Sequence, residues 1–159
     1  MRYDVLDRDA RIKLSIGTKQ RGNADGLFDS PYGLAFDHHR GLLLVADNTN
    51  DRVQVLSCND DGNGDSFVSK FGEEGSQPGQ FHYPESIAID HDHDRILVSD
   101  TGNDRVQSWS LSDQSFVSCA GQFGSGDLEF QCPQGIAIDK RHHRIIIADT
   151  FHNRLVFLS

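Results

Sequence analysis

The chain has 159 residues and a formal net charge of −9, from 24 acidic and 15 basic side chains. This balance opposes binding of a polyanion through bulk electrostatics. The longest apolar runs, at 42–46 and 145–148, are too short to cross a bilayer, and the first nine residues are too charged for a signal peptide. We therefore expect a soluble, cytoplasmic protein that does not engage a membrane.

The cysteines do not indicate a metal framework or a disulfide framework. Cys58, Cys119 and Cys132 contain no Cys-x-x-Cys pair, and any disulfide scheme leaves one of the three over. Reduced thiols in a reducing compartment are the simpler interpretation.

Three segments of the chain repeat one pattern. Pro84 follows Pro31 by 53 residues, and Pro133 follows Pro84 by 49. The Phe, Asp and Arg positions of the pattern keep the same two intervals. A period near 50 residues, made of short apolar runs separated by Gly, Asp and Asn, is typical of a β-propeller blade.

Each repeat contains runs that we expect to be β-strands. The first run alternates large and small apolar residues, the second is continuously apolar, the third is mixed and the fourth is polar, as suits an exposed edge. In chain order the runs lie at 34–37, 42–46, 53–56 and 67–70, then 87–90, 96–99, 106–109 and 116–119, then 136–139, 145–148 and 155–158. The predicted fold class is all-β, with propeller blades of four antiparallel strands. The large residues of the first runs are expected to be buried between blades: Leu34, Phe36, Ile87, Ile89, Ile136 and Ile138.

The full pattern is Gly-x(5)-Phe-x-x-Pro-x-Gly-[Leu/Ile]-Ala-[Phe/Ile]-Asp, followed by Val-Ala-Asp-x-x-Asn-x-Arg-[Val/Leu]-Gln. It closely resembles the NHL repeat of six-bladed β-propellers over about residues 17–159. The second copy departs from the pattern at Ser86 and Ser99, and the third has His152 at the Asn position. The resemblance implies a propeller that presents loops to a protein or peptide partner. Such repeats often form the C-terminal propellers of tripartite-motif-like proteins, which implies a possible substrate-recognition module of a ubiquitin ligase.

The resemblance also divides residues 1–159, a single propeller segment, into blades. Residues 2–6 and 11–15 resemble a third and a fourth strand. The assignment is 1–17 for the outer strands of a preceding or partner blade, 18–71 for blade 1, 72–120 for blade 2, and 121–159 for blade 3 without its outer strand. About three blades cannot close a ring of six. We therefore expect either a homodimer that closes six blades or a fragment of a longer propeller.

Polar residues that recur in every repeat are interpreted as scaffold, because a catalytic site is normally unique while repeats share structural chemistry. These structural repeat residues are Pro31, Asp47, Arg52, Pro84, Asp100, Arg105, Pro133, Asp149 and Arg154.

Six of the eight histidines fall in the turns between the first and second runs: His38, His39, His91, His93, His142 and His143. Imidazole and carboxylate groups bind divalent metals, but no spacing joins these turns into one four-ligand site. The turns are expected to be exposed hairpin tips, and we predict neither a metal nor another cofactor.

The resemblance places partner contacts on the face that carries the long connections and the turns between the second and third runs. The candidate partner-binding residues are Asn48, Asn50, Asp51, Glu73, Glu74, Phe81, His82, Tyr83, Thr101, Asn103, Asp104, Asp127, Glu129, Phe151, His152 and Asn153. Acidic residues outnumber basic ones on this face, so RNA is an unlikely partner. The predicted function is a non-catalytic protein-interaction scaffold, and an RNA-binding NHL propeller is the alternative.

An enzyme is the third possibility. The sequence has no nucleophile elbow, zinc-protease motif or phosphate loop, and no catalytic residue is predicted. A metal-dependent propeller lyase or lactonase would need inward-facing ligands near the axis, where this chain has mostly small residues.

Overall fold

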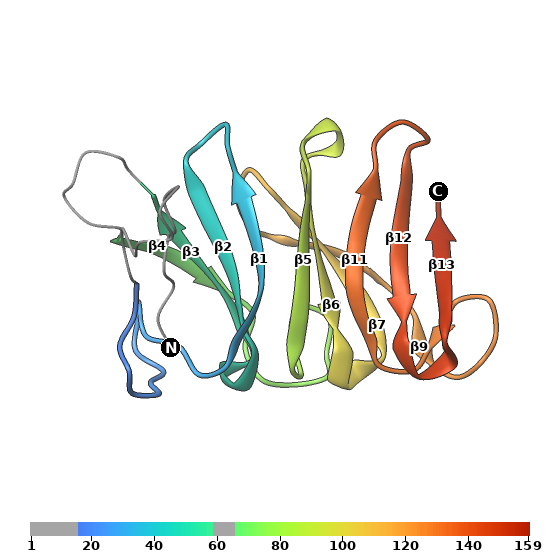
Figure 1. Ribbon diagram of the computed structural model, residues 1–159, viewed down its shortest axis with the longest axis horizontal. Helices are drawn as coiled ribbons and strands as arrows, with labels where there is room; N and C mark the ends of the chain where they lie inside the picture. The colour runs from blue at the N-terminus through green and yellow to red at the C-terminus, as the bar shows by residue number, and fades with distance from the viewer. Residues whose placement is uncertain (1–15, 59–65) are drawn as a thin grey trace, which may run out of the picture.

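The computed structural model describes residues 16–58 and 66–159 and shows three antiparallel sheets standing side by side (Figure 1). The first blade comprises β1 (Pro31–Asp37), β2 (Leu42–Asp47), β3 (Arg52–Ser57) and β4 (Ser66–Phe71). The second comprises β5 (Pro84–Asp90), β6 (Arg95–Asp100), β7 (Arg105–Ser110) and β8 (Phe116–Ala120). The third comprises β11 (Pro133–Asp139), β12 (Arg144–Asp149) and β13 (Arg154–Leu158). The all-β prediction of four-stranded antiparallel blades in a partial propeller is confirmed.

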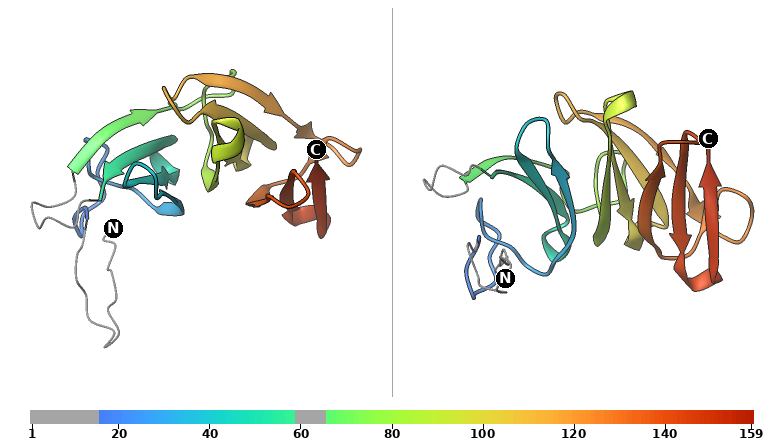
Figure 2. Two further views of the ribbon diagram at one scale, coloured as in Figure 1. Left: turned by 90° about the horizontal axis from the view of Figure 1, so that it is seen from above. Right: turned by 45° about the horizontal axis from the view of Figure 1, so that its top comes forward.

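The blades form an arc when viewed from above, with β1, β5 and β11 on its inner side (Figure 2). Within each blade the strands follow chain order, as in a meander. The connection into the third blade carries a short parallel pair, β9 (Gln122–Phe123) and β10 (Glu129–Phe130). Residues 2–6 and 11–15, predicted to be outer strands, lie outside the described residues.

The turns after β2, β6 and β12 are single 3-10 turns: η1 (Asn48–Asn50), η3 (Thr101–Asn103) and η4 (Thr150–His152). Each ends on a left-handed residue, Asp51, Asp104 or Asn153, with φ of 50°, 53° and 53°. Asn and Asp tolerate this conformation better than other non-glycine residues. A further turn, η2 (His91–His93), joins β5 to β6.

Blade packing follows from the two faces of each sheet. The face toward the following blade, here called the trailing face, carries Ala35, Leu44 and Val55 in the first blade. The face toward the preceding blade, here called the leading face, carries Ile87 and Val98 in the second. These two faces bury each other in one cluster.

The junction between the second and third blades uses the same positions. The trailing face of the second blade contributes Ala88 and Leu97, and the leading face of the third contributes Ile136, Ile138 and Ile147. A small residue at the Ala position lets the inner strands approach closely where the blades converge.

The prediction that Leu34 and Phe36 are buried is wrong in this structure, because their exposed fractions are 45% and 52%. They lie on the leading face of the first blade, which no described blade covers. The prediction holds for Ile87, which is buried, while Ile89, Ile136 and Ile138 pack against the clusters at the blade junctions and stay partly exposed.

A phenylalanine from each incoming connection is fully buried. Phe81 packs beside Phe71 and Trp109, at ring-centroid distances of 6.4 and 5.4 Å. Phe28 and Phe130 hold the equivalent positions. At Gly72 the chain has a φ of 81°, and a Cβ there would collide with the Phe81 ring, so the position requires glycine.

No helix among the described residues is long and apolar enough to cross a membrane.

Candidate functional site

The polar residues at the end of each blade where β2, β6 and β12 finish, the lower end in Figure 1, form a hydrogen-bonded network. In the second blade Asp100 is fully buried, and its Oδ2 accepts from Arg105 Nε at 2.7 Å and from Gln107 Nε2 at 2.8 Å. Its Oδ1 accepts from the backbone N–H of His82 at 2.7 Å. Arg105 donates its remaining N–H groups to the carbonyls of Ser76, Gln77 and Gln80. The pair therefore ties the incoming connection to its own blade.

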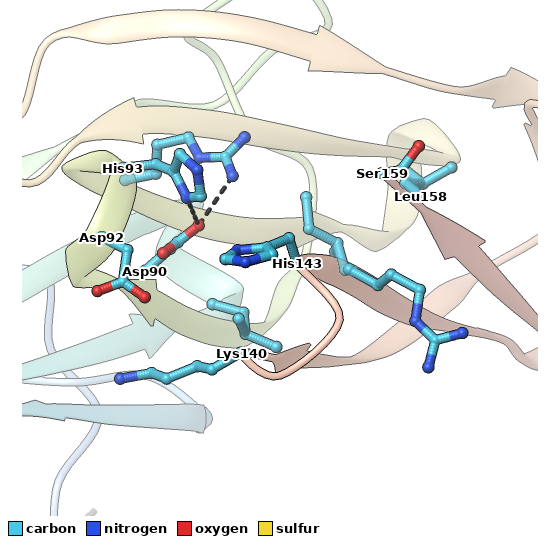
Figure 3. Close-up of a pocket in the computed structure, with 11 residues that line it drawn as sticks. Asp90, Asp92, His93, Lys140, His143, Leu158 and Ser159 are labelled. Atoms are coloured by element: carbon cyan, nitrogen blue, oxygen red, sulfur yellow. Dashed lines mark hydrogen bonds and ion pairs between the residues drawn. The ribbon is translucent and has the colours of Figure 1, made fainter.

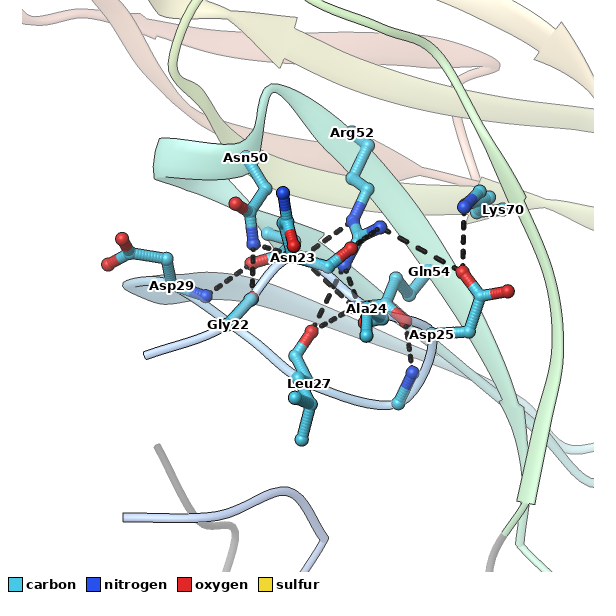
Figure 4. Close-up of polar contacts among 12 residues, drawn as sticks. Gly22, Asn23, Ala24, Asp25, Leu27, Asp29, Asn50, Arg52, Gln54 and Lys70 are labelled. Carbon is cyan, nitrogen blue, oxygen red and sulfur yellow. Dashed lines mark hydrogen bonds and ion pairs between the residues drawn. The ribbon is translucent and has the colours of Figure 1, made fainter. Parts of the chain in front are cut away.

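The first blade repeats this network around Arg52, which pairs with Asp47 at 2.8 Å and donates to three carbonyls of residues 23–27 (Figure 4). Asp149 and Arg154 repeat it in the third, at 2.7 Å. The candidate Asn50 completes the first network by donating to Asp47, as Asn103 does to Asp100. In the third blade His152 takes this place, with Nδ1 2.8 Å from Asp149.

Other candidates on this face connect neighbouring blades. Asn48 donates to the carbonyl of Pro84, and Thr101 donates to that of Pro133. Asp51 accepts from the backbone N–H of Tyr83 at 2.7 Å. Asp104 does the same for Cys132, at 2.8 Å. Burial raises the pKa of Asp51 above its ordinary 3.8, although the hydrogen bond from Tyr83 opposes that rise.

The remaining candidates differ in accessibility. Phe81 is enclosed in the core, so its ring presents no surface to a partner. Tyr83 and Phe151 are exposed. Among the acids, Glu73, Glu74 and Asp127 are exposed. Glu73 accepts from the side-chain amide of Gln80, the backbone of Glu74 forms a β-bridge with that of Phe81, and Glu129 accepts from the N–H of Gly126. His82 and Asn153 complete the set, with His82 stacked 4.4 Å from Tyr83 and Asn153 at the left-handed position after η4.

The opposite end of the blades carries the histidine turns. Asp90 accepts from His93 and Arg95, each at 2.8 Å (Figure 3). Burial would raise the pKa of Asp90, but these two hydrogen bonds hold it below 3.8. In the third blade Asp139 accepts from Arg144 at 2.7 Å and from His142 at 2.8 Å.

The hydrogen bonds from Arg144 and His142 lower the pKa of Asp139 from 3.8 to about 2. Because the folded-state pKa is depressed, Asp139 stabilises the fold above pH 3.8 and loses this contribution as the pH falls toward 2. We expect a carboxyl NMR titration to give a midpoint near 2 in the native chain, and Arg144→Met to raise it toward 3.8. Arg141→Met, at an exposed neighbour, should leave it unchanged; equal midpoints in all three proteins would contradict this interpretation.

The first blade departs from this arrangement. Three residues after Asp37 stands Arg40 instead of histidine, and five residues after it stands Leu42 instead of arginine. Asp37 is fully buried, and its Oδ2 has no hydrogen-bond partner. His91, from the turn of the next blade, brings Nε2 to 3.8 Å from Asp37 Oδ1.

His38 and His39 lie next to Asp37 in the chain and form a cluster with His91. One ring nitrogen from each of His38, His39 and His91 lies within 4.8 Å of the others. Sequence spacing places these histidines in turns but could not predict the cluster, because packing of two blades brings together turns that are 52 residues apart in the chain. Burial lowers the pKa of His91 below 6.5; Asp37 opposes this shift, while His39, His38 and Lys140 add to it.

Among the described residues, apolar side chains are exposed on the blade faces at the two ends of the arc. The leading face of the first blade exposes Leu34 and Phe36 over the partly buried Leu43. The trailing face of the third blade exposes Leu155 at 62% and Phe157 at 49%. We call these the open leading face and the open trailing face.

Such a fold, with repeated polar anchors at one end of every blade, defines a β-propeller. A family model described as a 6-bladed beta-propeller matches residues 27–122. The chain therefore belongs to this six-bladed β-propeller family.

The chain is similar in sequence or in fold to proteins with different names. It is 31% identical over 111 residues to peptidylglycine alpha-amidating monooxygenase of Rattus norvegicus. The aligned segment covers 67% of this chain and 11% of that protein. A functionally unknown protein from Desulfotomaculum acetoxidans has a TM-score of 0.66 at 16% identity, over 99% of this chain and 47% of that one. Glutaminyl cyclase of Myxococcus xanthus has a TM-score of 0.53 at 13% identity, over 91% and 64%. The chain thus spans about a tenth of the rat relative and about half of the Desulfotomaculum protein.

Proposed function

We propose that this chain is an NHL-type, non-catalytic protein-interaction module that docks through its open blade faces. One observation carries the proposal. The open leading face and the open trailing face are the two kinds of face that bury each other at both internal junctions. Leu34 and Phe36 occupy the positions of Ile87 and Ile89, which lie against a trailing face within the molecule.

The partner best matched to these faces is a second copy of the chain. In a six-bladed ring each blade turns by about 60°, so three blades fill half a turn. A two-fold rotation then sets each open trailing face against the open leading face of the other copy, and both seams close. Closed two-fold assemblies are the commonest homo-oligomers. Further blades of a longer polypeptide would use the same two faces.

The face that carries the incoming connections and the turns η1, η3 and η4, here called the loop face, stays exposed in such a ring. It is the proposed contact for a protein or peptide ligand. Tyr83 and Phe151 offer exposed rings there, and the nearby Asp127 carboxylate is exposed. The buried Asp–Arg networks beneath these residues hold the connections in place.

A charge placed in either seam should separate the copies. We expect Phe36→Asp and Phe157→Asp each to convert an assembly of two chains into a monomer of 17.7 kDa, because each change buries an unpaired carboxylate in both seams. Light scattering after size exclusion measures this. Val117→Asp, on an exposed outer-strand position, is the matched control and should leave the mass unchanged.

Mixing the two variants separates head-to-tail docking from other contacts. A pair made of one Phe36→Asp chain and one Phe157→Asp chain keeps one native seam and places both carboxylates in the other. The mixture should therefore recover part of the two-chain mass that neither variant forms alone. Absence of any recovery, with both variants folded, would contradict the head-to-tail arrangement.

A propeller enzyme is the second candidate, favoured by the 31% identity to peptidylglycine alpha-amidating monooxygenase. Incubating the chain with peptidylglycine substrates or with lactones, with and without divalent metal, tests it by mass spectrometry. We expect no product above the blank. Metal-dependent turnover would replace the interaction proposal with a lyase or lactonase.

A further inference from the structure

We propose that His38, His39 and His91 form a binding site for a divalent transition-metal ion, of the Zn²⁺, Cu²⁺ or Ni²⁺ class, that bridges the first and second blades. Neutral imidazole nitrogen is a preferred ligand for these ions. The site lies at the turn end of the blades, away from the loop face and independent of the open faces.

The geometry of the three rings fits one ion. Their ligand nitrogens lie within 4.8 Å of one another, and the ring centroids are 4.2, 4.3 and 5.1 Å apart. Metal–nitrogen bonds of about 2.0–2.1 Å on a tetrahedral ion set nitrogens about 3.3 Å apart. His38 and His39 are exposed, so rotation of their side chains can close this difference without moving the backbone. A water molecule would take the fourth position.

Asp37 gives a second, independent indication. Its carboxylate is fully buried, and Oδ2 has no hydrogen-bond partner, which is costly for a charged group. Arg40 approaches Oδ2 only to 3.8 Å, and its Nη1 donates to the carbonyl of Leu111. A carboxylate beside a ligating histidine is the usual outer support of a metal ion. Asp37 lies 3.8 Å from His91 and would hold that ring in position.

Comparison with the other blades shows that this corner is specialised. Asp90 and Asp139 are neutralised by their own histidine and arginine at 2.7–2.8 Å. Asp37 has neither of these side chains; its Oδ1 accepts from the backbone N–H groups of His39 and Arg40, and His91 of the three-histidine cluster lies 3.8 Å from it. At the place of His91 the third blade has Lys140, which cannot serve as a neutral nitrogen ligand while protonated. A cation bound by the three histidines would add positive charge near Asp37, as Arg95 does at 2.8 Å from Asp90 in the second blade.

Metal titration of the 159-residue chain without an affinity tag tests the proposal. Calorimetry with Zn²⁺ should give one ion for each chain, and Cu²⁺ should show electron paramagnetic resonance splitting from nitrogen ligands. His91→Ala and His39→Ala should each weaken Zn²⁺ binding by at least about tenfold, and Asp37→Asn by about 10–100-fold. His143→Asn is the matched control: His143 is exposed on the third-blade turn with φ of 52°, which Asn tolerates.

Circular dichroism and the melting temperature of each variant confirm that it is folded. Because His39 is exposed, its replacement keeps the test valid even if His91→Ala or Asp37→Asn destabilises the blade junction. Lack of stoichiometric binding overturns the proposal. Equal affinity in His39→Ala and His143→Asn overturns it as well, because binding would then belong to scattered surface histidines.

Discussion

Replacing Phe81 with alanine is expected to lower the free energy of unfolding by about 3–5 kcal/mol. The ring is fully buried, lies between the first two blades beside Phe71 and Trp109, and covers Gly72. Truncation removes its contacts with both blades and leaves a cavity that the stiff strands cannot fill. Urea denaturation followed by tryptophan fluorescence measures the loss, because Trp109 reports on the same cluster.

Phe123→Ala is the matched control. That ring is 68% exposed in β9, so its removal should change stability by no more than about 0.5 kcal/mol. A loss at Phe81 no larger than at Phe123 would show that the blades do not pack as described.

Replacing Asp100 with alanine should also cost about 3–5 kcal/mol, because it leaves a buried charge without its partner. Arg105 and Gln107 would each lose the carboxylate that accepts from them, and the backbone N–H of His82 would lose its acceptor. The connection held by Arg105 should then loosen, and hydrogen exchange of its amides should become faster. Urea denaturation measures the loss of stability, and amide hydrogen exchange measures the loosening of the connection.

Asp127→Ala supplies the control for charge. Asp127 is exposed on the equivalent connection of the third blade, so its removal should leave stability within about 0.5 kcal/mol. Similar effects of the two changes would show that Asp100 contributes only through net charge.

Much of the fold can be predicted from the sequence, because each blade is specified locally. Alternation around Ala35 and Ala88 marks the inner strands, and the continuous apolar runs after them mark the covered second strands. The left-handed turn residues Asp51 and Asp104 follow from the preference of Asp for that conformation.

What the sequence could not predict depends on neighbours in space. Leu34 and Ile87 occupy the same position in their repeats, yet only Ile87 is covered, because burial depends on whether a blade stands in front. The corner of His38, His39 and His91 is likewise invisible in the sequence, since packing of two blades brings the turns together. The different surroundings of Asp37 show in the sequence only as a repeat that lacks the histidine three residues on and the arginine five residues on that the other two repeats have.

The central claim is that the open leading face and the open trailing face complete a ring between two copies. Native mass spectrometry of the 159-residue chain, at micromolar concentration and near-neutral pH, tests it most directly. We predict a species of two chains, twice the 17.7 kDa of one chain, and no ladder of larger assemblies. A folded, monodisperse species of 17.7 kDa would contradict the claim.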